Sequence, residues 1–173
     1  MATRVEGVRV RKQLTKWTCG PASIRIIFGY YGVPVAEQEL VERAGIRNDG
    51  TSNWQISYMA NRYGFKYWGR YGGTIRQLEH FLKQGIPILI CYQDYGRANG
   101  LNGHFAVLTG IDSRWVEIAD PANHNGTPVA RAKRMHRVVF LKRWFEMEDG
   151  IKTYRWFGII RPRGAQSKGN KNA

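Results

Sequence analysis

The setting of Cys19 suggests chemistry. Gly20 and Pro21 follow it, and the apolar residues after them recur at helical spacing up to Tyr31 and Gly32, so a helix is expected to begin near Cys19. Backbone amides at a helix N-terminus, and the positive end of the helix dipole, favour a thiolate over a thiol. Cys19 is therefore a candidate nucleophile. A free cysteine is also commonly a small buried apolar residue, and this feature alone leaves both interpretations open.

A cysteine nucleophile needs a base, and this chain has four histidines. His80 is expected on the polar side of a helix, His124 in a loop rich in Gly and Asn, and His136 in an arginine-rich stretch. His104 differs because it begins an expected strand, which makes it the candidate base. The four histidines lack the spacing of metal ligands, so we expect no metal and no cofactor.

A hairpin connects His104 with a carboxylate. The segments 104–111 and 115–120 alternate around an expected turn at Asp112 and Ser113. With Asp112 at the centre of the reversal, His104 lies directly opposite Asp120, and Cβ atoms in such a pair are roughly 4.5–5.5 Å apart. The carboxylate could then hold the imidazole tautomer and stabilise its charged form. A His and an Asp that merely close a hairpin end are the other interpretation. The face they share is apolar, with Ala106, Leu108, Val116 and Ile118.

Gln13 is the fourth candidate. It lies six residues before Cys19, where its side-chain amide could donate an N–H beside the sulfur. Together with the backbone amide of Cys19, it would bind the oxyanion of a tetrahedral intermediate, a contribution worth roughly 10²–10³ in rate. A lone Gln is more simply a surface residue, so this role depends on the other three candidates.

The elements that must position these residues change type along the chain. Helices are expected over 19–31, 34–44, 54–63 and 74–83, the last with a capping box of Thr74 and Gln77. Strands are expected over 65–71, 86–93, 104–111, 115–120, 137–139 and 154–160, with a short helix over 140–147. We therefore predict an α+β fold in which N-terminal helices pack on a mainly antiparallel sheet.

Composition limits the function classes. The 173 residues fit one domain, which we place at 1–163, followed by a disordered basic tail at 164–173. The longest apolar run is too short to cross a bilayer and no signal peptide is present, so we expect a soluble, cytoplasmic protein. The formal net charge of +14 suggests contact with a polyanion or nucleic acid, or simply a solvated basic face. The oligomeric state is not indicated.

Several of these residues lie in short motifs that together resemble one known family. The motifs are Gln13, then Cys19-Gly20-Pro21-Ala22-Ser23, Tyr30-Tyr31-Gly32, Gly103-His104-Phe105-Ala106-Val107-Leu108, and Asp120-Pro121. In this order they resemble the bacteriocin-processing (double-glycine) cysteine peptidases of the papain-like superfamily, and in particular the free-standing members. The similarity runs over about residues 10 to 122 and more loosely to about 161.

The resemblance implies a papain-like fold and a role for each candidate. Cys19 would be the nucleophile, His104 the general base and then acid, Asp120 the residue that orients the imidazole, and Gln13 the oxyanion donor. It implies a thiol hydrolase that cleaves a peptide or isopeptide bond of a peptide or protein substrate through an acyl-enzyme. Members that belong to exporters cut after a double glycine and usually carry an acidic residue where this chain has Thr18, so the cleavage specificity stays open.

A second hypothesis belongs to another class. The fold could serve as a catalytically weak or inactive papain-like module in a basic structural or nucleic-acid-associated protein. The charge supports it, as do Trp68, Trp115 and Trp156, which could stack on bases if exposed. Salt-dependent nucleic-acid affinity without catalysis would favour this hypothesis over the first.

Overall fold

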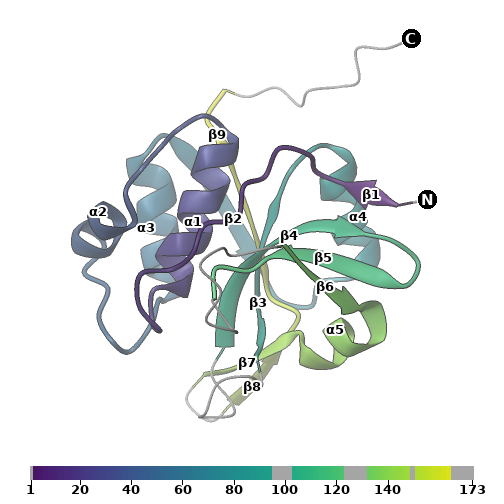
Figure 1. Ribbon diagram of the computed structural model, residues 1–173. Helices are drawn as coiled ribbons and strands as arrows, with labels where there is room; N and C mark the ends of the chain where they lie inside the picture. The colour runs from purple at the N-terminus through teal and green to yellow at the C-terminus, as the bar shows by residue number, and fades with distance from the viewer. Residues whose placement is uncertain (1, 95–102, 123–131, 149–150, 165–173) are drawn as a thin grey trace.

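The computed structural model describes residues 2–94, 103–122, 132–148 and 151–164, and within them five helices surround a large antiparallel sheet (Figure 1). The helices are α1 (Cys19–Tyr30), α2 (Glu37–Arg43), α3 (Asn53–Arg62), α4 (Ile75–Lys83) and α5 (Arg137–Arg143). The strands are β1 (Thr3–Arg4), β2 (Phe65–Arg70), β3 (Ile88–Gln93), β4 (Gly103–Ile111), β5 (Trp115–Ala119), β6 (Ala132–His136), β7 (Phe145–Glu148), β8 (Ile151–Tyr154) and β9 (Phe157–Pro162).

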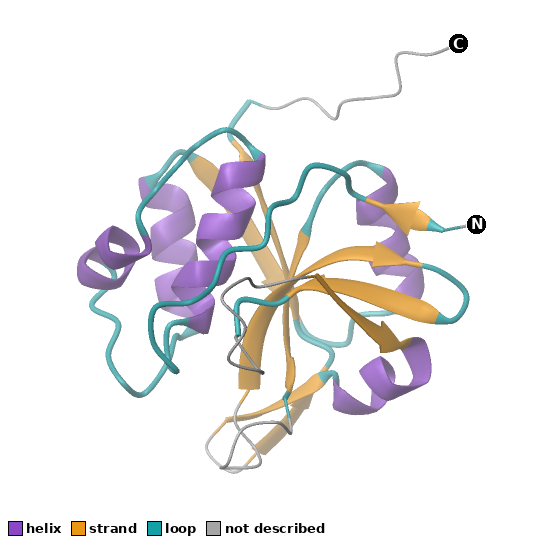
Figure 2. Ribbon diagram, in the orientation of Figure 1, coloured by secondary structure: helices purple, strands orange, loops and turns teal. Residues whose placement is uncertain are grey.

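The main sheet separates two groups of helices. Its strand order is β2-β9-β3-β4-β5-β6, with β1 paired to β4, and every neighbouring pair is antiparallel. Helices α1, α2 and α3 lie together on one side, whereas α4 and α5 lie on the other (Figure 2). The hairpin of β7 and β8 is separate. The predicted α+β class, with N-terminal helices on a mainly antiparallel sheet, is confirmed.

Local signals fix the helix ends. Helix α1 begins at Cys19, as expected, and Gly32 follows it with a φ of 81°, a conformation that glycine adopts without strain. The predicted capping box of Thr74 and Gln77 is present at the start of α4. Ser52 forms a second capping box at the start of α3. These caps satisfy backbone amides that have no partner within the helix.

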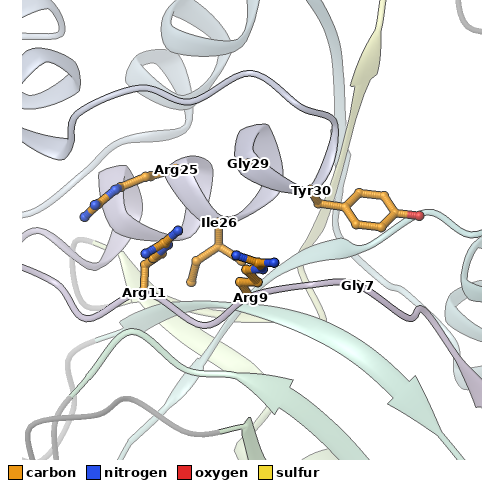
Figure 3. Close-up of a pocket in the computed structure, with 7 residues that line it drawn as sticks. All are labelled: Gly7, Arg9, Arg11, Arg25, Ile26, Gly29 and Tyr30. Atoms are coloured by element: carbon orange, nitrogen blue, oxygen red, sulfur yellow. The ribbon is translucent and has the colours of Figure 1, made fainter.

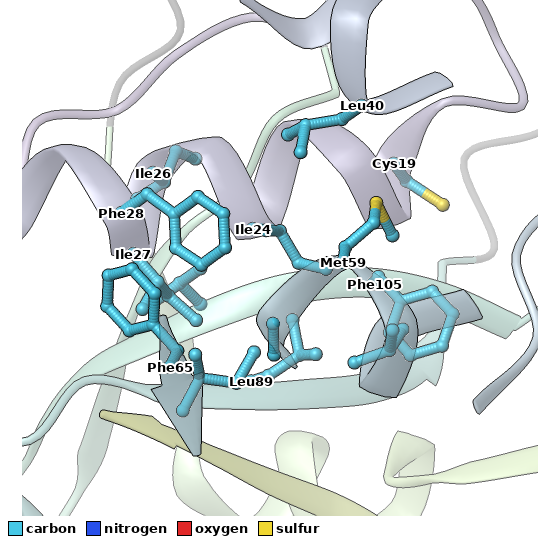
Figure 4. Close-up of a cluster of buried hydrophobic side chains, with 14 of the residues drawn as sticks. Cys19, Ile24, Ile26, Ile27, Phe28, Leu40, Met59, Phe65, Leu89 and Phe105 are labelled. Atoms are coloured by element: carbon cyan, nitrogen blue, oxygen red, sulfur yellow. The ribbon is translucent and has the colours of Figure 1, made fainter. Parts of the chain in front are cut away.

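Two clusters of buried side chains hold the layers together. The first joins α1, α2 and α3 to residues of β3 and β4 such as Leu89, Cys91 and Phe105, and Cys19 lies at one end of it (Figure 4). The second joins α4 and α5 to the alternate residues of the same strands, including Ile90 and Ala106. All six residues of β3 are buried, as expected for a central strand. The apolar face predicted for the hairpin belongs to the second cluster.

The predicted register of the β4–β5 hairpin is wrong by two residues. The turn is centred beyond Asp112, and a bulge interrupts the ladder between Leu108 and Gly110, so that Val107 pairs with Ala119. Continuing this register places Asp120 opposite Ala106 rather than His104. Because side chains alternate with a period of two, a two-residue error leaves His104 and Asp120 on the same face as diagonal neighbours.

Two predictions near the C-terminus are also wrong. The expected strand 137–139 and helix 140–147 are instead the helix α5 followed by the strand β7. The side chain of His136 caps α5 by accepting a hydrogen bond from the Val138 amide, and Phe140 packs in the core. These contacts outweigh the local strand preference of two adjacent valines. The expected strand 154–160 is divided between β8 and β9, with Arg155 between them at a φ of 58°.

The N-terminal residues of the chain pair with the main sheet. Strand β1 pairs with the end of β4, and the Val5 amide donates to the Thr109 carbonyl. In the described part of the chain no helix is both long enough and apolar enough to cross a membrane. Most of the predicted tail, 165–173, lies outside the described residues.

Candidate active site

The first turn of α1 carries the sulfur. Cys19 is the first residue of the helix and is only 6% exposed, and the first turn contains no acidic side chain to oppose a negative charge. A Cβ added to Gly20 would lie 2.5–2.7 Å from atoms of the Thr51 side chain. Glycine at position 20 therefore lets the segment before α3 pack against the helix end, and this packing helps to fix where Cys19 lies.

The predicted imidazole and carboxylate are in contact. His104 Nε2 donates to Asp120 Oδ1 over 2.7 Å, and both side chains are almost completely buried. The Ala122 amide donates to the same carboxylate oxygen over 2.8 Å. A buried carboxylate with this geometry fixes the imidazole orientation and stabilises the imidazolium form. The bulge thus returns the two residues to one face of the sheet, where they lie within hydrogen-bonding distance.

The same imidazole interacts with the sulfur. Burial disfavours the imidazolium, but a hydrogen bond to Asp120, a hydrogen bond to Cys19 and the negative charges of both groups raise the His104 pKa to about 9. The positive ring then favours the thiolate in return, since the attraction between two charges acts equally on both. The three side chains from α1, β4 and the end of β5 therefore form one buried charge network.

Residues that the sequence did not indicate complete the surroundings of Asp120. The Tyr92 hydroxyl donates to Asp120 Oδ2 over 2.7 Å. Lys133 Nζ donates to that hydroxyl over 3.3 Å and lies 3.7 Å from Asp120 Oδ2. Burial and the Asp120 charge raise the pKa of Tyr92, which keeps it a neutral donor. Tyr92 lies opposite His104 in the pairing of β3 with β4, a long-range contact that leaves no local signal in the sequence.

One group of described residues has the composition of a metal site. Donor atoms of Asp94, His104 and Asp120 lie within 4.8 Å of one another. Lys133 Nζ is 3.6 Å from Asp94 Oδ1 and also contacts Asp120, so an ammonium group already supplies positive charge there. The arrangement fits a lysine-neutralised carboxylate pair better than a metal centre, because a cation next to Lys133 would be repelled.

Gln13 lies next to the network. Its backbone amide donates to the Pro121 carbonyl over 2.9 Å, which places it beside the residue that follows Asp120. The side chain is buried, and its Nε2 donates to the Thr15 carbonyl. This bond orients the Gln13 amide, and an NH₂ group has two donor hydrogens, so the side chain can donate to more than one acceptor.

A buried acid holds the segment that contains Gln13. Glu37 Oε1 accepts a hydrogen bond from the Leu14 amide over 2.8 Å, and Glu37 Oε2 lies 3.8 Å from Arg25 Nη1. Burial raises the Glu37 pKa, while the bonds from Leu14 and Thr18 and the charge of Arg25 oppose the rise. The sequence alone indicates no role for Glu37, because a contact across 23 residues leaves no local pattern.

The aromatic residues proposed for base stacking do not form one surface. Trp156 is buried at 2% exposure and packs edge-on against Phe105, so the interpretation of Trp156 as exposed is wrong. Trp68 is 46% exposed, and Trp115 is half-buried beneath the guanidinium of Arg134.

Comparison with known proteins identifies the relatives of this chain. The model of the Peptidase_C39 like family matches residues 5–151. An uncharacterized protein of Methanothermobacter thermautotrophicus is 29% identical over 122 residues, covering 70% of this chain and 78% of that protein. The peptidase domain of Streptococcus ComA, a bifunctional ABC transporter involved in quorum sensing, superposes with a TM-score of 0.70 at 19% identity, covering 90% of this chain and 99% of that domain.

A second solved structure is that of a double glycine motif protease from an AMS/PCAT transporter in complex with its leader peptide. It superposes with a TM-score of 0.64 at 23% identity, covering 92% of this chain and 98% of that protease. The fold is thus that of the papain-like cysteine peptidases. Within that class, this chain belongs to the Peptidase_C39 like family, whose members are cysteine peptidases.

Proposed function

We propose that Cys19, His104 and Asp120 are the catalytic residues of a cysteine peptidase that cleaves peptide or isopeptide bonds. The observation that supports this most is the buried imidazole of His104, which lies 2.7 Å from Asp120 and whose pKa is raised to about 9 by its hydrogen bonds to Asp120 and Cys19 and by the charges of both groups. Near neutral pH that imidazole is charged. A thiolate paired with an imidazolium is the reactive form of a thiol hydrolase.

The reaction has two halves. The Cys19 sulfur forms a bond to the substrate carbonyl carbon and gives a tetrahedral oxyanion. That intermediate collapses as the C–N bond breaks, and the leaving amine takes the proton from the His104 imidazolium. Water then attacks the thioester and gives a proton to the now neutral imidazole. The C–S bond breaks, releasing the carboxylic acid and restoring the ion pair. Asp120 holds the ring in one orientation throughout.

The oxyanion is assigned to two donors. The backbone amide of Cys19 is at the start of α1, where helix amides have no intrahelical acceptor. The side-chain amide of Gln13 is the second. The backbone bond of Gln13 to Pro121 ties it to the residue after Asp120, so the donor and the orienting carboxylate belong to one connected unit.

We propose a peptide segment of a protein as the substrate class. The support is the family together with a superposed relative that was solved with a leader peptide. Cleavage after Gly-Gly is one specificity to be tested, since Thr18 departs from the acidic residue usual in exporter-borne members. A cytoplasmic location and contact of the basic surface with a polyanion remain part of the proposal, and the net charge of +14 supports the second.

The two cysteines allow a test without a known substrate. Native protein at pH 7 is treated with iodoacetamide, and the adducts are counted by intact mass over time. We expect one rapid adduct in the unchanged protein and in Cys91→Ala, and none on the same timescale in Cys19→Ala. His104→Ala should slow labelling by roughly 10²-fold or more, because the imidazolium no longer stabilises the thiolate.

Protein unfolded in urea serves as the control, because both thiols are then exposed and should react at similar rates. If native Cys19 reacted no faster than the unfolded thiols, or if His104→Ala had no effect, the proposal would be wrong. Hydrolysis of peptides with and without Gly-Gly before the scissile bond then tests the specificity, with Cys19→Ala as the blank.

A further inference from the structure

Three arginines surround a small pocket beside α1. The pocket has a volume of about 80 Å³ and is lined by Gly7, Arg9, Arg11, Arg25, Ile26, Gly29 and Tyr30. Figure 3 shows Arg9 and Arg11 rising from the N-terminal segment toward α1, with Arg25 leaving the helix beside them. We refer to this site as the arginine pocket. It is separate from the sulfur and the imidazole, and neither Cys19 nor His104 lines it.

The sequence of the N-terminal segment explains why two arginines point the same way. Val8 and Val10 pack against the buried clusters, and the residues between and after them, Arg9 and Arg11, are exposed. In extended chain alternate side chains share one side, and residues two apart are separated by roughly 6.6 Å. The apolar anchors therefore hold both guanidinium groups over the helix. An added Cβ on Gly29 would meet nothing within 4 Å, so α1 leaves space below them.

The charges in the arginine pocket are largely uncompensated. Among the described residues, neither Arg9 nor Arg11 lies within 4.0 Å of a carboxylate oxygen. Arg25 has one anionic neighbour, Glu37, at 3.8 Å, on a carboxylate that is buried and also bonded by the Leu14 amide. This contact restrains Arg25 at the edge of the pocket while its side chain remains 31% exposed. Three arginines thus line a volume that has one buried negative charge nearby.

We propose that the arginine pocket binds a phosphate group. A guanidinium offers planar paired donors that match phosphate oxygens, and three of them suit a tetrahedral, multiply charged anion better than a single carboxylate, which one arginine can satisfy. The phosphate can be free or part of a phosphodiester chain, and the same pocket chemistry serves both. The proposal is independent of catalysis by Cys19, since none of the lining residues belongs to the catalytic network.

Calorimetric titration with inorganic phosphate, at constant ionic strength in a chloride background, tests the site. The titration uses Cys19→Ala, so that the result does not depend on the peptidase reaction. We expect saturable binding of one phosphate per chain. The double variant Arg9→Ala/Arg11→Ala should weaken that binding about tenfold or more. Arg62→Ala/Arg76→Ala, which removes the same charge from α3 and α4, should bind as the parent does.

Two further titrations identify the source of the phosphate and its selectivity. A short oligothymidylate that competes with inorganic phosphate indicates a phosphodiester ligand, whereas phosphate binding without such competition indicates a free ion. Both outcomes support the pocket. Acetate at the same ionic strength should bind at least tenfold more weakly than phosphate. The proposal is overturned if neither phosphate nor the oligothymidylate binds, if acetate binds equally, or if the two double variants weaken binding to the same extent.

Discussion

Cys19 and Cys91 have nearly equal burial and very different surroundings. Cys19 is 6% exposed and Cys91 is 2% exposed, and both belong to the same buried cluster. Cys19 begins a helix and is hydrogen-bonded to a charged imidazole. Cys91 lies within the central strand β3, where burial, the charges of Glu146 and Cys19 and a hydrogen bond to Glu146 raise its pKa well above the usual value.

The difference shows that burial alone does not determine whether a thiol reacts. Loss of water disfavours the thiolate in both places. At Cys19 this cost is opposed by the imidazolium and by the helix amides, whereas at Cys91 the neighbouring charges are negative and add to the cost. A nucleophile in a buried site therefore depends on the sign of the charges around it, and each prediction below changes those charges at one of the two sites.

Substitution Asp120→Asn should have the largest effect on the difference in reactivity between Cys19 and Cys91. The imidazole loses the carboxylate that orients it and stabilises its positive form, so peptide hydrolysis should fall by roughly 10²–10⁴-fold. The matched control is Asp112→Asn in the same hairpin, where Asp112 Oδ1 accepts hydrogen bonds from the Arg114 and Trp115 amides. Steady-state kinetics should show near-normal activity for the control. Equal losses in both variants would mean that the hairpin, rather than the carboxylate, was disturbed.

Raising the pH should reduce the reactivity of Cys19 gradually, as the His104 imidazolium loses its proton. A His pKa of about 9 means that the imidazolium persists through neutral pH and is lost as the pH rises through that value. Hydrolysis should then fall about tenfold per pH unit above 9, because the neutral ring cannot protonate the leaving amine. The stability linked to this charge is fully present below the ordinary value of 6.5 and is lost between 6.5 and 9.

NMR titration of the His104 ring gives the pKa directly. The same titration in Asp120→Asn should move the midpoint downward, since the hydrogen bond and the negative charge are both removed. A midpoint near 6.5 in the unchanged protein would contradict the charge network.

The sequence predicted the parts of this site that depend on local pattern. The start of α1 at Cys19 follows from helix punctuation, and the shared face of His104 and Asp120 follows from strand alternation. The exact opposition of the two residues was wrong because the turn is centred beyond Asp112, and the bulge near Thr109, which has no clear local signal, then brings the register back to an even offset. The prediction that the two side chains share a face is still correct, because a register error of an even number of residues leaves each side chain on the same face of the sheet.

The rest of the site could not be predicted because it depends on strands that meet only in the folded chain. Tyr92 comes from β3 and Lys133 from β6, yet both contact Asp120. Glu37 reaches the Leu14 amide from another helix. The mistaken strand at 137–139 has the same origin, since burial of Phe140 in the second cluster is a tertiary effect that outweighs local preference.

Lys133→Met should reduce peptide hydrolysis by several-fold and shift the alkaline limb of its pH profile. Lys133 partly neutralises Asp120 and donates to the Tyr92 hydroxyl, so its loss leaves the carboxylate less well anchored. The His104 ring then feels a more negative neighbour, and the midpoint of the alkaline limb should rise. A purely structural weakening would not raise it. Lys152→Met is the matched control, because Lys152 also lies over an aromatic ring, 3.9 Å from the centroid of Phe145.

Pre-steady-state and steady-state pH profiles of both lysine variants separate the outcomes. If the midpoint of the alkaline limb were unchanged in Lys133→Met, and its activity loss equalled that of Lys152→Met, Lys133 would not act through Asp120.

Glu146→Gln should have the smallest effect, and it tests what keeps Cys91 unreactive. The substitution removes one negative charge beside Cys91, which should lower its pKa, but burial is the largest cause of the raised value and is unchanged. We therefore expect a single iodoacetamide adduct in the native variant and hydrolysis within about twofold of the parent. The Tyr67 pKa, raised to about 12 by burial and by Glu146, should fall and can be followed by ultraviolet absorbance. Glu6→Gln, at an exposed position, is the control. Rapid labelling of native Cys91 in Glu146→Gln alone would mean that charge, rather than burial, protects this thiol.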